Sequence, residues 1–268
     1  MTRLGSGAHI DDTAAVDSRA LLDHPILAER YFFPRRDAVV DPWLVTGADG
    51  STLHGARRGP DGDVGVLHFH GNGEVVADWA DDFGGSLGAA GLPTWFAEYR
   101  GYGGSEGRPA LASMLDDALA FADATGHPPE RLIVYGRSVG SLYALHVAAH
   151  RRVGALVLES GIADLLQRIG LRVRPEELGA TEAQLRDAVA ASFDHRTKIE
   201  ATQCPVLVLH AVRDHLVDFA HGEDLARWAG DRGRLVAFPR GDHNSIHAYN
   251  GPQILDEVIA LAARVRAS

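Results

Sequence analysis

Residues 132–141 read Leu-Ile-Val-Tyr-Gly-Arg-Ser-Val-Gly-Ser, a short apolar run that ends in Gly-x-Ser-x-Gly. A run typical of a helix follows, from Leu142 to His150. This order of strand, sharp turn and helix is the nucleophile-elbow pattern, in which Ser138 stands in a strained turn. Gly136 and Gly140 omit the Cβ atoms that would collide where strand and helix meet. The stretch therefore predicts Ser138 as a nucleophile at the end of a strand.

Outward from this stretch, strand-like apolar runs alternate with helical patterns at short spacing. The predicted strands are 39–45, 52–56, 64–69, 93–97, 132–135, 155–158, 206–209 and 235–238, and the predicted helices are 75–90, 111–125, 142–150, 182–192, 222–229 and 254–265. Such alternation predicts an α/β fold whose mostly parallel sheet is covered by helices on both faces. Asp49-Gly50 between the first two strands predicts a hairpin turn.

The alternation of predicted strands and helices divides the chain into an N-terminal extension (1–36), one core domain (37–161 and 201–268) and an insertion (162–200). Thr181 is a cap-like residue before the helical pattern inside the insertion. Insertions at this point stand above the strand ends, where open α/β sheets bind ligands. We therefore expect a small helical lid. The alternative is a structural helical insertion that does not touch the substrate.

Composition narrows the class of protein. The chain has 268 residues, 46% of them hydrophobic, and a net charge of −10, which argues against a nucleic-acid partner because no basic excess is present. No stretch is long and apolar enough to span a membrane, and Met1 to Asp12 lacks a signal-peptide core, so we expect a cytoplasmic protein. The single cysteine, Cys204, excludes an intramolecular disulfide and is expected in the core.

A serine hydroxyl is a weak nucleophile that needs a base and an acid that orients the base. The predicted strand at 206–209 leads into Asp214, and the next strand leads into Gly-Asp-His-Asn, which contains His243. The chain order of Ser, Asp and His is that of α/β-hydrolase triads, and each member follows a strand of the same sheet. We predict Ser138, Asp214 and His243 as a catalytic triad.

Other residues compete for these roles. Glu159 also follows a predicted strand and is the main alternative for the acid, whereas Asp218 fits a helix cap better. Ser141 lies one helical turn beyond the elbow, and Ser160 lacks the preceding Gly-x pattern. His247, four residues after the predicted base, would give a metal-binding spacing on a helix, but its context favours a loop and no metal.

The reaction also requires N–H donors that stabilise the oxyanion. One is the N–H after the nucleophile, at Val139. The other is expected in the loop His70-Gly71-Asn72-Gly73, where the glycines let the backbone approach the substrate. We assign Asn72, with Gly71 and Gly73 as neighbouring alternatives, and we expect Gly71 close to the substrate. His70 is predicted to hold this loop.

A second glycine-rich loop, Arg100 to Gly107, follows a predicted strand. It lacks the Gly-Lys-Ser/Thr of a phosphate-binding loop and the dinucleotide fingerprint. We interpret it as a tight loop beside the active site, with Tyr102 facing the substrate.

Taken together, five motifs resemble the α/β-hydrolase superfamily, and within it the Bem46-like proteins and α/β-hydrolase domain-containing proteins 13 and 17. The motifs are His-Gly-Asn-Gly, Tyr-Arg-Gly-Tyr-Gly-Gly-Ser-Glu-Gly, Gly-Arg-Ser-Val-Gly-Ser, Ala-Val-Arg-Asp and Gly-Asp-His-Asn. The resemblance covers residues 39–266. It implies an eight-stranded sheet, no cofactor, the same three triad residues, and hydrolysis of carboxylic esters or thioesters. Some relatives remove palmitoyl groups, but this chain lacks their N-terminal anchor segment.

The sequence thus predicts a serine hydrolase that acts on a small-molecule acyl compound without a cofactor. A peptidase or amidase with the same triad is an alternative, and a ligand-binding protein that kept the fold without turnover is another. Enzymes with an aspartate nucleophile are disfavoured because position 138 is serine. Acyl-chain length and oligomeric state stay open.

Overall fold

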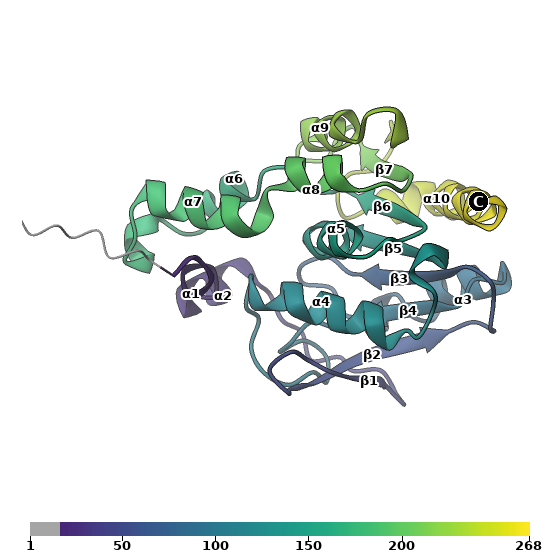
Figure 1. The fold of residues 1–268 in the computed structure, drawn as a ribbon, viewed down its shortest axis with the longest axis horizontal. Coiled ribbons are helices and arrows are strands. Elements are labelled where there is room, and N and C mark those ends of the chain that lie inside the picture. Colours follow the sequence, from purple (N-terminus) through teal and green to yellow (C-terminus); the bar gives the residue numbers. More distant parts are fainter. Residues whose placement is uncertain (1–16) are drawn as a thin grey trace, which may run out of the picture.

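The computed structural model describes residues 17–268, and the part of the N-terminal extension before residue 17 lies outside the described residues. Within them an eight-stranded sheet has the order β1-β2-β4-β3-β5-β6-β7-β8 (Figure 1). The strands are β1 (Trp43–Thr46), β2 (Thr52–Arg58), β3 (Gly65–Phe69), β4 (Thr94–Ala97), β5 (Leu132–Arg137), β6 (Ala155–Glu159), β7 (Val206–Ala211) and β8 (Gly233–Phe238). β1–β2 and β2–β4 are antiparallel, and the other pairs are parallel. The predicted fold class is confirmed.

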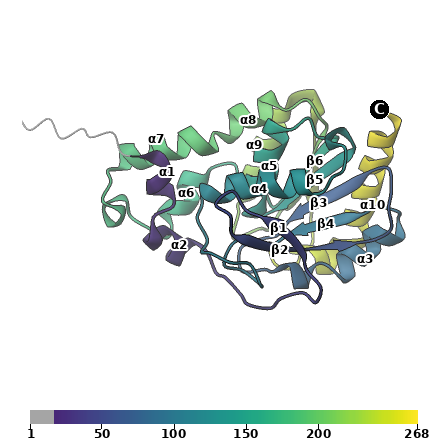
Figure 2. The same cartoon turned by 60° about the horizontal axis from the view of Figure 1, so that its bottom comes forward.

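Helices cover both faces of this sheet (Figures 1 and 2). In residues 17–268 the α-helices are α1 (Ser18–Leu22), α2 (Pro25–Tyr31), α3 (Asp82–Ala89), α4 (Ser113–Ala124), α5 (Gly140–His150), α6 (Leu165–Gly170), α7 (Glu182–Phe193), α8 (His195–Ala201), α9 (Phe219–Ala229) and α10 (Ile246–Ala267). The short 3₁₀ turns are η1 (Val76–Asp78), η2 (Pro129–Arg131), η3 (Pro175–Leu178) and η4 (Gly230–Arg232). α3 and α10 lie on one face, and α4, α5, α8 and α9 on the other.

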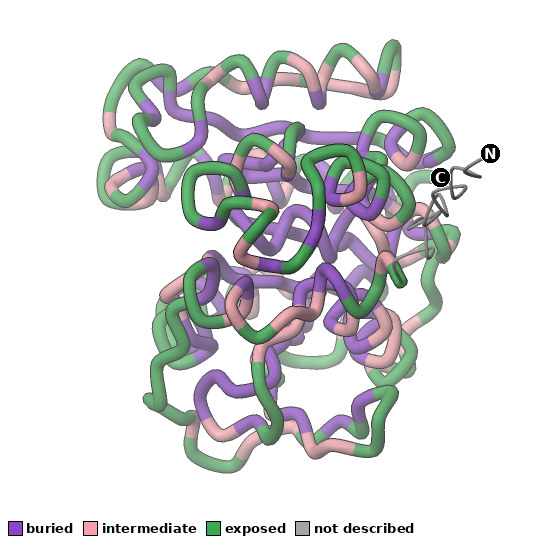
Figure 3. Tube along the Cα trace, turned by 90° about the vertical axis from the view of Figure 1, so that its left-hand side faces the viewer, coloured by how far each residue is buried: buried purple, intermediate pink, exposed green. Residues whose placement is uncertain are grey.

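The two helical layers explain why the strands are apolar throughout. Val134 of β5 belongs to the core that includes α4 and α5, whereas Ile133 and Tyr135 belong to the core that includes α3 and α10. All three side chains are fully buried, as expected for a parallel sheet covered on both sides. Figure 3 shows that buried residues gather in the middle of the molecule, with exposed residues on the outer helices and loops.

Two predicted helices have different bounds. The predicted helix at 75–90 is instead two elements, η1 and α3. The Val76 N–H donates to Glu98 Oε2 (2.9 Å) and the Val75 N–H to Asp78 Oδ2 (3.1 Å), so side chains bind the first donors of η1, which have no partner inside a helix. The last helix, α10, begins at Ile246 and passes through Pro252, whereas the prediction began after this proline.

The segment predicted as an insertion, 162–200, contains α6, η3, α7 and α8. The predicted helix after Thr181 is α7, and the Thr181 hydroxyl accepts from the Gln184 N–H as a cap. α7 packs on α1, and α8 packs on α5 and α9. Figures 1 and 2 both place α6 and α7 beside α1 and α2, beyond one edge of the sheet. Within residues 17–268, no helix is both long and apolar enough to cross a bilayer.

Candidate active site

Ser138 lies between β5 and α5 in a left-handed backbone conformation, with φ of 52°. Its N–H donates to the Glu159 carbonyl oxygen at 2.8 Å. The adjoining glycines are required by close packing: a Cβ on Gly140 would lie 2.2 Å from the Phe69 carbonyl oxygen, and one on Gly136 would lie 2.4 Å from the Gly140 carbonyl oxygen. A strained turn with these contacts is the geometry of a nucleophile elbow.

His243 joins the serine to an aspartate. Its Nε2 lies 3.0 Å from Ser138 Oγ, and its Nδ1 lies 2.7 Å from Asp214 Oδ2. An ionised carboxylate accepts only, so Nδ1 carries the proton and Nε2 is left to accept from the serine hydroxyl. The structure therefore brings together the three residues predicted as a triad, in the order in which a proton would move.

Asp214 is held as an anion by its surroundings. Its second oxygen, Oδ1, accepts from the backbone N–H groups of Leu216 (2.9 Å) and Val217 (2.8 Å). Burial alone would raise the pKa of Asp214, but its hydrogen bonds and the charge of a protonated His243 hold that pKa below its ordinary value. The sequence pattern did not reveal these backbone donors, which belong to the loop after β7.

Glu159, the alternative acid, has different partners. Its carboxylate binds Arg137 Nη1 at 2.6 Å, the Tyr135 hydroxyl and His247 Nε2 at 2.9 Å, and the structure shows no contact with His243 among the described residues. Burial opposes ionisation, but the charges of His247 and Arg137 lower the pKa of Glu159 strongly. His247 is therefore a partner of Glu159 on α10, and within residues 17–268 no group of three or more metal-binding side chains forms.

The remaining alternatives occupy structural positions. Asp218 caps α9 by accepting from the Ala220 N–H at 2.9 Å. Ser141 donates to the Ser138 carbonyl oxygen (2.6 Å) and accepts from the Ile162 N–H (3.0 Å). Ser160 is fully buried, also with positive φ, and its hydroxyl has no partner in the described part of the chain.

The loop after β3 approaches the elbow. His70 holds it, as predicted, through Nδ1 to the Gly71 carbonyl oxygen (2.8 Å) and Nε2 to Glu98 Oε1 (2.8 Å). Burial opposes protonation, yet the charge of Glu98 raises the pKa of His70 above its ordinary value. The backbone N–H groups of Asn72 and Val139 donate to no partner within residues 17–268, so both remain available as donors.

Tyr102 differs from its prediction. The side chain is fully buried, and its hydroxyl donates to Asn72 Oδ1 at 2.8 Å rather than pointing toward a substrate. The Phe33 N–H donates to the same oxygen at 3.0 Å, and Asn72 Nδ2 donates to the Tyr31 carbonyl oxygen. Tyr102 and the end of α2 therefore fix the Asn72 side chain. Nothing local in the sequence links residues 31–33 to this loop.

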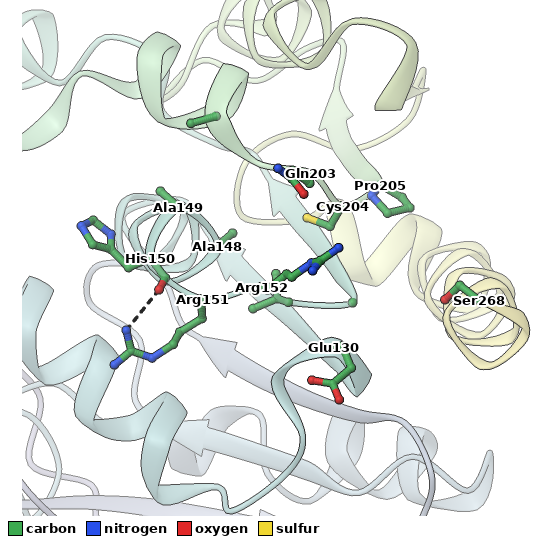
Figure 4. Close-up of a pocket in the computed structure, with 13 residues that line it drawn as sticks. Glu130, Ala148, Ala149, His150, Arg151, Arg152, Gln203, Cys204, Pro205 and Ser268 are labelled. Carbon is green, nitrogen blue, oxygen red and sulfur yellow. Dashed lines mark hydrogen bonds between the residues drawn. The ribbon is translucent and has the colours of Figure 1, made fainter.

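A separate cavity lies at the amino ends of the strands, whereas the triad residues follow the carboxyl ends. It has a volume of about 590 Å³ and includes Gly154 and Pro205, which precede β6 and β7 (Figure 4). Cys204 and Arg152 also line it, and burial raises the pKa of the Cys204 thiol to about 11. Because the triad follows the carboxyl ends of the strands, this cavity is remote from Ser138.

An eight-stranded, mostly parallel sheet with a Ser, an Asp and a His after β5, β7 and β8 defines the class of α/β-hydrolases. Comparison with known proteins agrees. Residues 62–176 match the family described as "Serine aminopeptidase, S33". An uncharacterised protein of Escherichia coli, YfhR, is 27% identical over 249 residues, which are 82% of this chain and 81% of that protein.

Two further proteins, one compared by sequence and one by structure, are also similar to this chain. Human α/β-hydrolase domain-containing protein 17B is 27% identical over 170 residues, 62% of this chain and 55% of that protein. An esterase structure from Pyrococcus furiosus, 17% identical, superposes with a TM-score of 0.68 and covers 86% of this chain and 98% of its own. The chain therefore has the α/β-hydrolase fold, and its sequence is similar to those of α/β-hydrolase domain-containing proteins.

Proposed function

We propose that this α/β-hydrolase is a serine hydrolase that cleaves carboxylic esters or thioesters of a small-molecule acyl compound through an acyl-enzyme. The observation that carries the proposal is the position of His243, within hydrogen-bond distance of both Ser138 Oγ (3.0 Å) and Asp214 Oδ2 (2.7 Å). The esterases among the proteins of similar fold support the same chemistry.

In the proposed reaction, His243 Nε2 takes the proton of Ser138 as Oγ bonds to the acyl carbon. The tetrahedral intermediate collapses when the protonated His243 gives its proton to the leaving alcohol or thiol, and the bond to that group breaks. Water then attacks the acyl-serine, with His243 again as the base. The second intermediate collapses as the bond from Ser138 Oγ to the acyl carbon breaks, His243 returns its proton to Oγ, and the acid leaves. Asp214 fixes the His243 tautomer and stabilises the imidazolium.

The backbone N–H groups of Asn72 and Val139 would bind the oxyanion. Each such donor is worth about 2.7–4 kcal/mol of the barrier in comparable sites. Gly71 precedes Asn72, and a Cβ at this position would lie 2.9 Å from Glu74 Oε2, so glycine lets the Glu74 carboxylate bind the Gly71 N–H. No cofactor has a role in this scheme.

The proposed lid, 162–200, joins this site through backbone contacts. The Ile162 N–H donates to Ser141, one turn after the nucleophile, and Arg168 donates to the Leu216 carbonyl oxygen beside Asp214. Leu171, after α6, and Leu216 are exposed apolar side chains. We propose that this segment borders the acyl-binding region.

Labelling with a fluorophosphonate probe tests the nucleophile. The probe forms a covalent bond with an activated serine, so the wild-type protein becomes labelled and Ser138→Ala does not. Ser160→Ala is the matched control, because Ser160 is also buried and in a left-handed turn. We expect this control to be labelled like the wild type. Equal labelling of Ser138→Ala and wild type would refute the proposal.

A second candidate is an aminopeptidase or amidase with the same triad, favoured by the match to the serine aminopeptidase family. An aminopeptidase needs a carboxylate for the substrate α-ammonium group. The buried carboxylates around the triad, Glu74, Glu159 and Asp214, already bind protein groups. Turnover of p-nitrophenyl acyl esters compared with aminoacyl anilides separates the two functions, and we expect faster ester cleavage.

A further inference from the structure

Arg137, directly before the proposed nucleophile, occupies the centre of a buried ionic network. Its side chain is only 4% exposed. The guanidinium donates from Nε to Glu74 Oε1 (2.8 Å), from Nη1 to Glu159 Oε1 (2.6 Å) and from Nη2 to the His243 carbonyl oxygen (2.8 Å). One planar group therefore contacts three separate segments around Ser138: the loop after β3, the end of β6 and the loop after β8.

The first of these contacts leads to the oxyanion-hole loop. The other oxygen of Glu74, Oε2, accepts from the Gly71 N–H at 2.7 Å and from the Trp79 indole N–H at 3.1 Å. Gly71 precedes Asn72, whose N–H is the proposed oxyanion donor. The position of that donor is thus linked through Glu74 to Arg137 by two short hydrogen bonds.

The other contacts lead to the proposed base. Arg137 binds the backbone carbonyl oxygen of His243 directly. Glu159, the second carboxylate on Arg137, binds His247, which lies in the first turn of α10, four residues after His243. The backbone on which His243 sits is therefore held at two points, and both lead back to Arg137.

Stability alone does not account for such a network. Removing a guanidinium and two carboxylates from water costs free energy that their mutual attraction only partly returns, and apolar replacements of buried ion pairs are often as stable. What the network provides is geometry, since the planar guanidinium fixes the directions of its partners. An oxyanion hole requires such directions, because its donors act over a narrow range of distances.

We propose that Arg137 is a positioning residue that holds the oxyanion-hole loop and His243 at a set separation around Ser138. The inference rests on the proposed serine hydrolase function and assigns to this arginine the alignment of two groups that act on the same carbonyl. It touches no substrate itself.

Arg137→Lys tests the proposal, because lysine keeps the charge and loses the planar fork. We expect kcat for a p-nitrophenyl ester to fall about 10²-fold, as for a misplaced reacting group, with KM nearly unchanged. The affinity for an alkyl boronic acid, whose serine adduct is tetrahedral, should fall with kcat. The rate of each variant is divided by the amount of serine that a fluorophosphonate labels at completion. A smaller fraction of folded protein therefore does not lower the measured kcat.

Glu74→Gln is the second variant. It tests the same proposal if Arg137→Lys does not fold. Its amide keeps one oxygen acceptor but cannot bind both Gly71 and Arg137 as the carboxylate does. We expect a smaller loss of kcat and boronic acid affinity in the same direction.

Arg100→Lys is the matched control. Arg100, in the loop after β4, is also buried, and it binds Asp117 of α4 in a bidentate pair (2.6 Å each) and Asp49 of the β1–β2 turn (2.8 Å). Neither partner belongs to the segments that carry Asn72, Ser138, Asp214 and His243. We expect a lower melting temperature with unchanged kcat per labelled serine. Wild-type kcat and boronic acid affinity in the folded Arg137 and Glu74 variants would overturn the inference. Labelling of Ser138→Ala would instead overturn the proposed function.

Discussion

Glu159 ends β6 and Asp214 follows the neighbouring strand β7, yet of the two only Asp214 forms a hydrogen bond with His243. The pairing register explains the difference. Glu159 lies opposite Arg137 in the parallel β5–β6 pair, so its carboxylate meets the guanidinium and the Tyr135 hydroxyl. Asp214 lies three residues beyond β7, where the loop turns it toward His243.

This difference leads to a prediction for the acid. Asp214→Asn should lower kcat by about 10⁴-fold, because an amide disfavours the His243 tautomer that accepts from Ser138. Glu159→Gln should lower it far less, since the contacts of His243 with Ser138 and Asp214 remain. Steady-state ester hydrolysis measures both. A larger loss in Glu159→Gln than in Asp214→Asn would contradict the assignment, and Asp218→Asn, which alters only a helix cap, should behave as wild type.

The residues found from the sequence were those with a local signature. Ser138 stands in a five-residue motif and His243 in a glycine-flanked loop after a strand. The choice between Asp214 and Glu159 stayed open because both follow strands at one edge, and only register separates them. Arg137 was missed as a positioning residue. Its signal was present, since a guanidinium at the end of an apolar strand requires buried partners.

At the scale of elements, His221 of α9 attaches the segment 162–200 to the core, and His195 of α8 joins the two ends of that segment. The His221 Nδ1 accepts from the backbone N–H groups of Ala163 (3.1 Å) and Asp164 (3.3 Å), and His195 Nδ1 lies 3.2 Å from the Ala163 carbonyl oxygen. The His195 Nε2 is buried without a partner in the described part of the chain. Protonation would therefore place unpaired or opposed N–H groups at this junction.

The expected pH dependence follows. Burial, with the nearby Lys198, lowers the pKa of His195 to about 4, against about 6.5 in an unfolded chain. The stabilisation is complete above pH 6.5 and is lost as the pH falls toward 4, because the unfolded state binds the proton first. We expect a loss of about 2 kcal/mol between pH 7 and pH 5.

Hydrogen exchange of the amides in 162–170 measures this loss, after correction for the intrinsic exchange rate at each pH. His195→Phe should flatten the pH dependence, since it has nothing to protonate. Equal protection of these amides at pH 5 and pH 7 in the wild type would contradict the prediction.

Element types were predictable from apolar runs, but some bounds were not. η1 and α3 stand where one helix was predicted, and the Val76 N–H at the start of η1 donates to Glu98, which follows β4. The course of α10 through Pro252 depends on packing along the sheet rather than on local propensity. Likewise, the attachment of α2 to Asn72 joins segments 39 residues apart in the chain, from Phe33 to Asn72.

For the whole molecule, buried carboxylates set the acid limit of stability. The pKa values of Glu159, Glu74 and Asp214 are all lowered: burial opposes this in each, but the charge or hydrogen bonds of Arg137, His247 and His243 prevail. Unfolded carboxyls titrate near pH 4, so their stabilisation is complete above that pH and is lost below it.

We therefore expect the free energy of unfolding to fall steeply between about pH 4.5 and 2.5. Urea titrations followed by circular dichroism measure it. Glu159→Gln should have a lower stability at neutral pH and a shallower fall. Glu182→Gln, which removes an exposed pair with Arg186, should follow the wild-type slope. Identical slopes in wild type and Glu159→Gln would contradict the prediction.

The fluorescence of Trp79 can report on the ionic network around Ser138, because the indole contacts that network. Its indole N–H binds Glu74, the Arg137 guanidinium lies 5.6 Å above its ring, and the His247 ring meets it edge-on at 4.8 Å. The chromophore thus contacts Glu74, which binds the loop of the proposed oxyanion donor, and Arg137, which binds the backbone of the proposed base. Its emission would change when a ligand or substitution shifts either group, which gives the enzyme an intrinsic optical probe of active-site alignment.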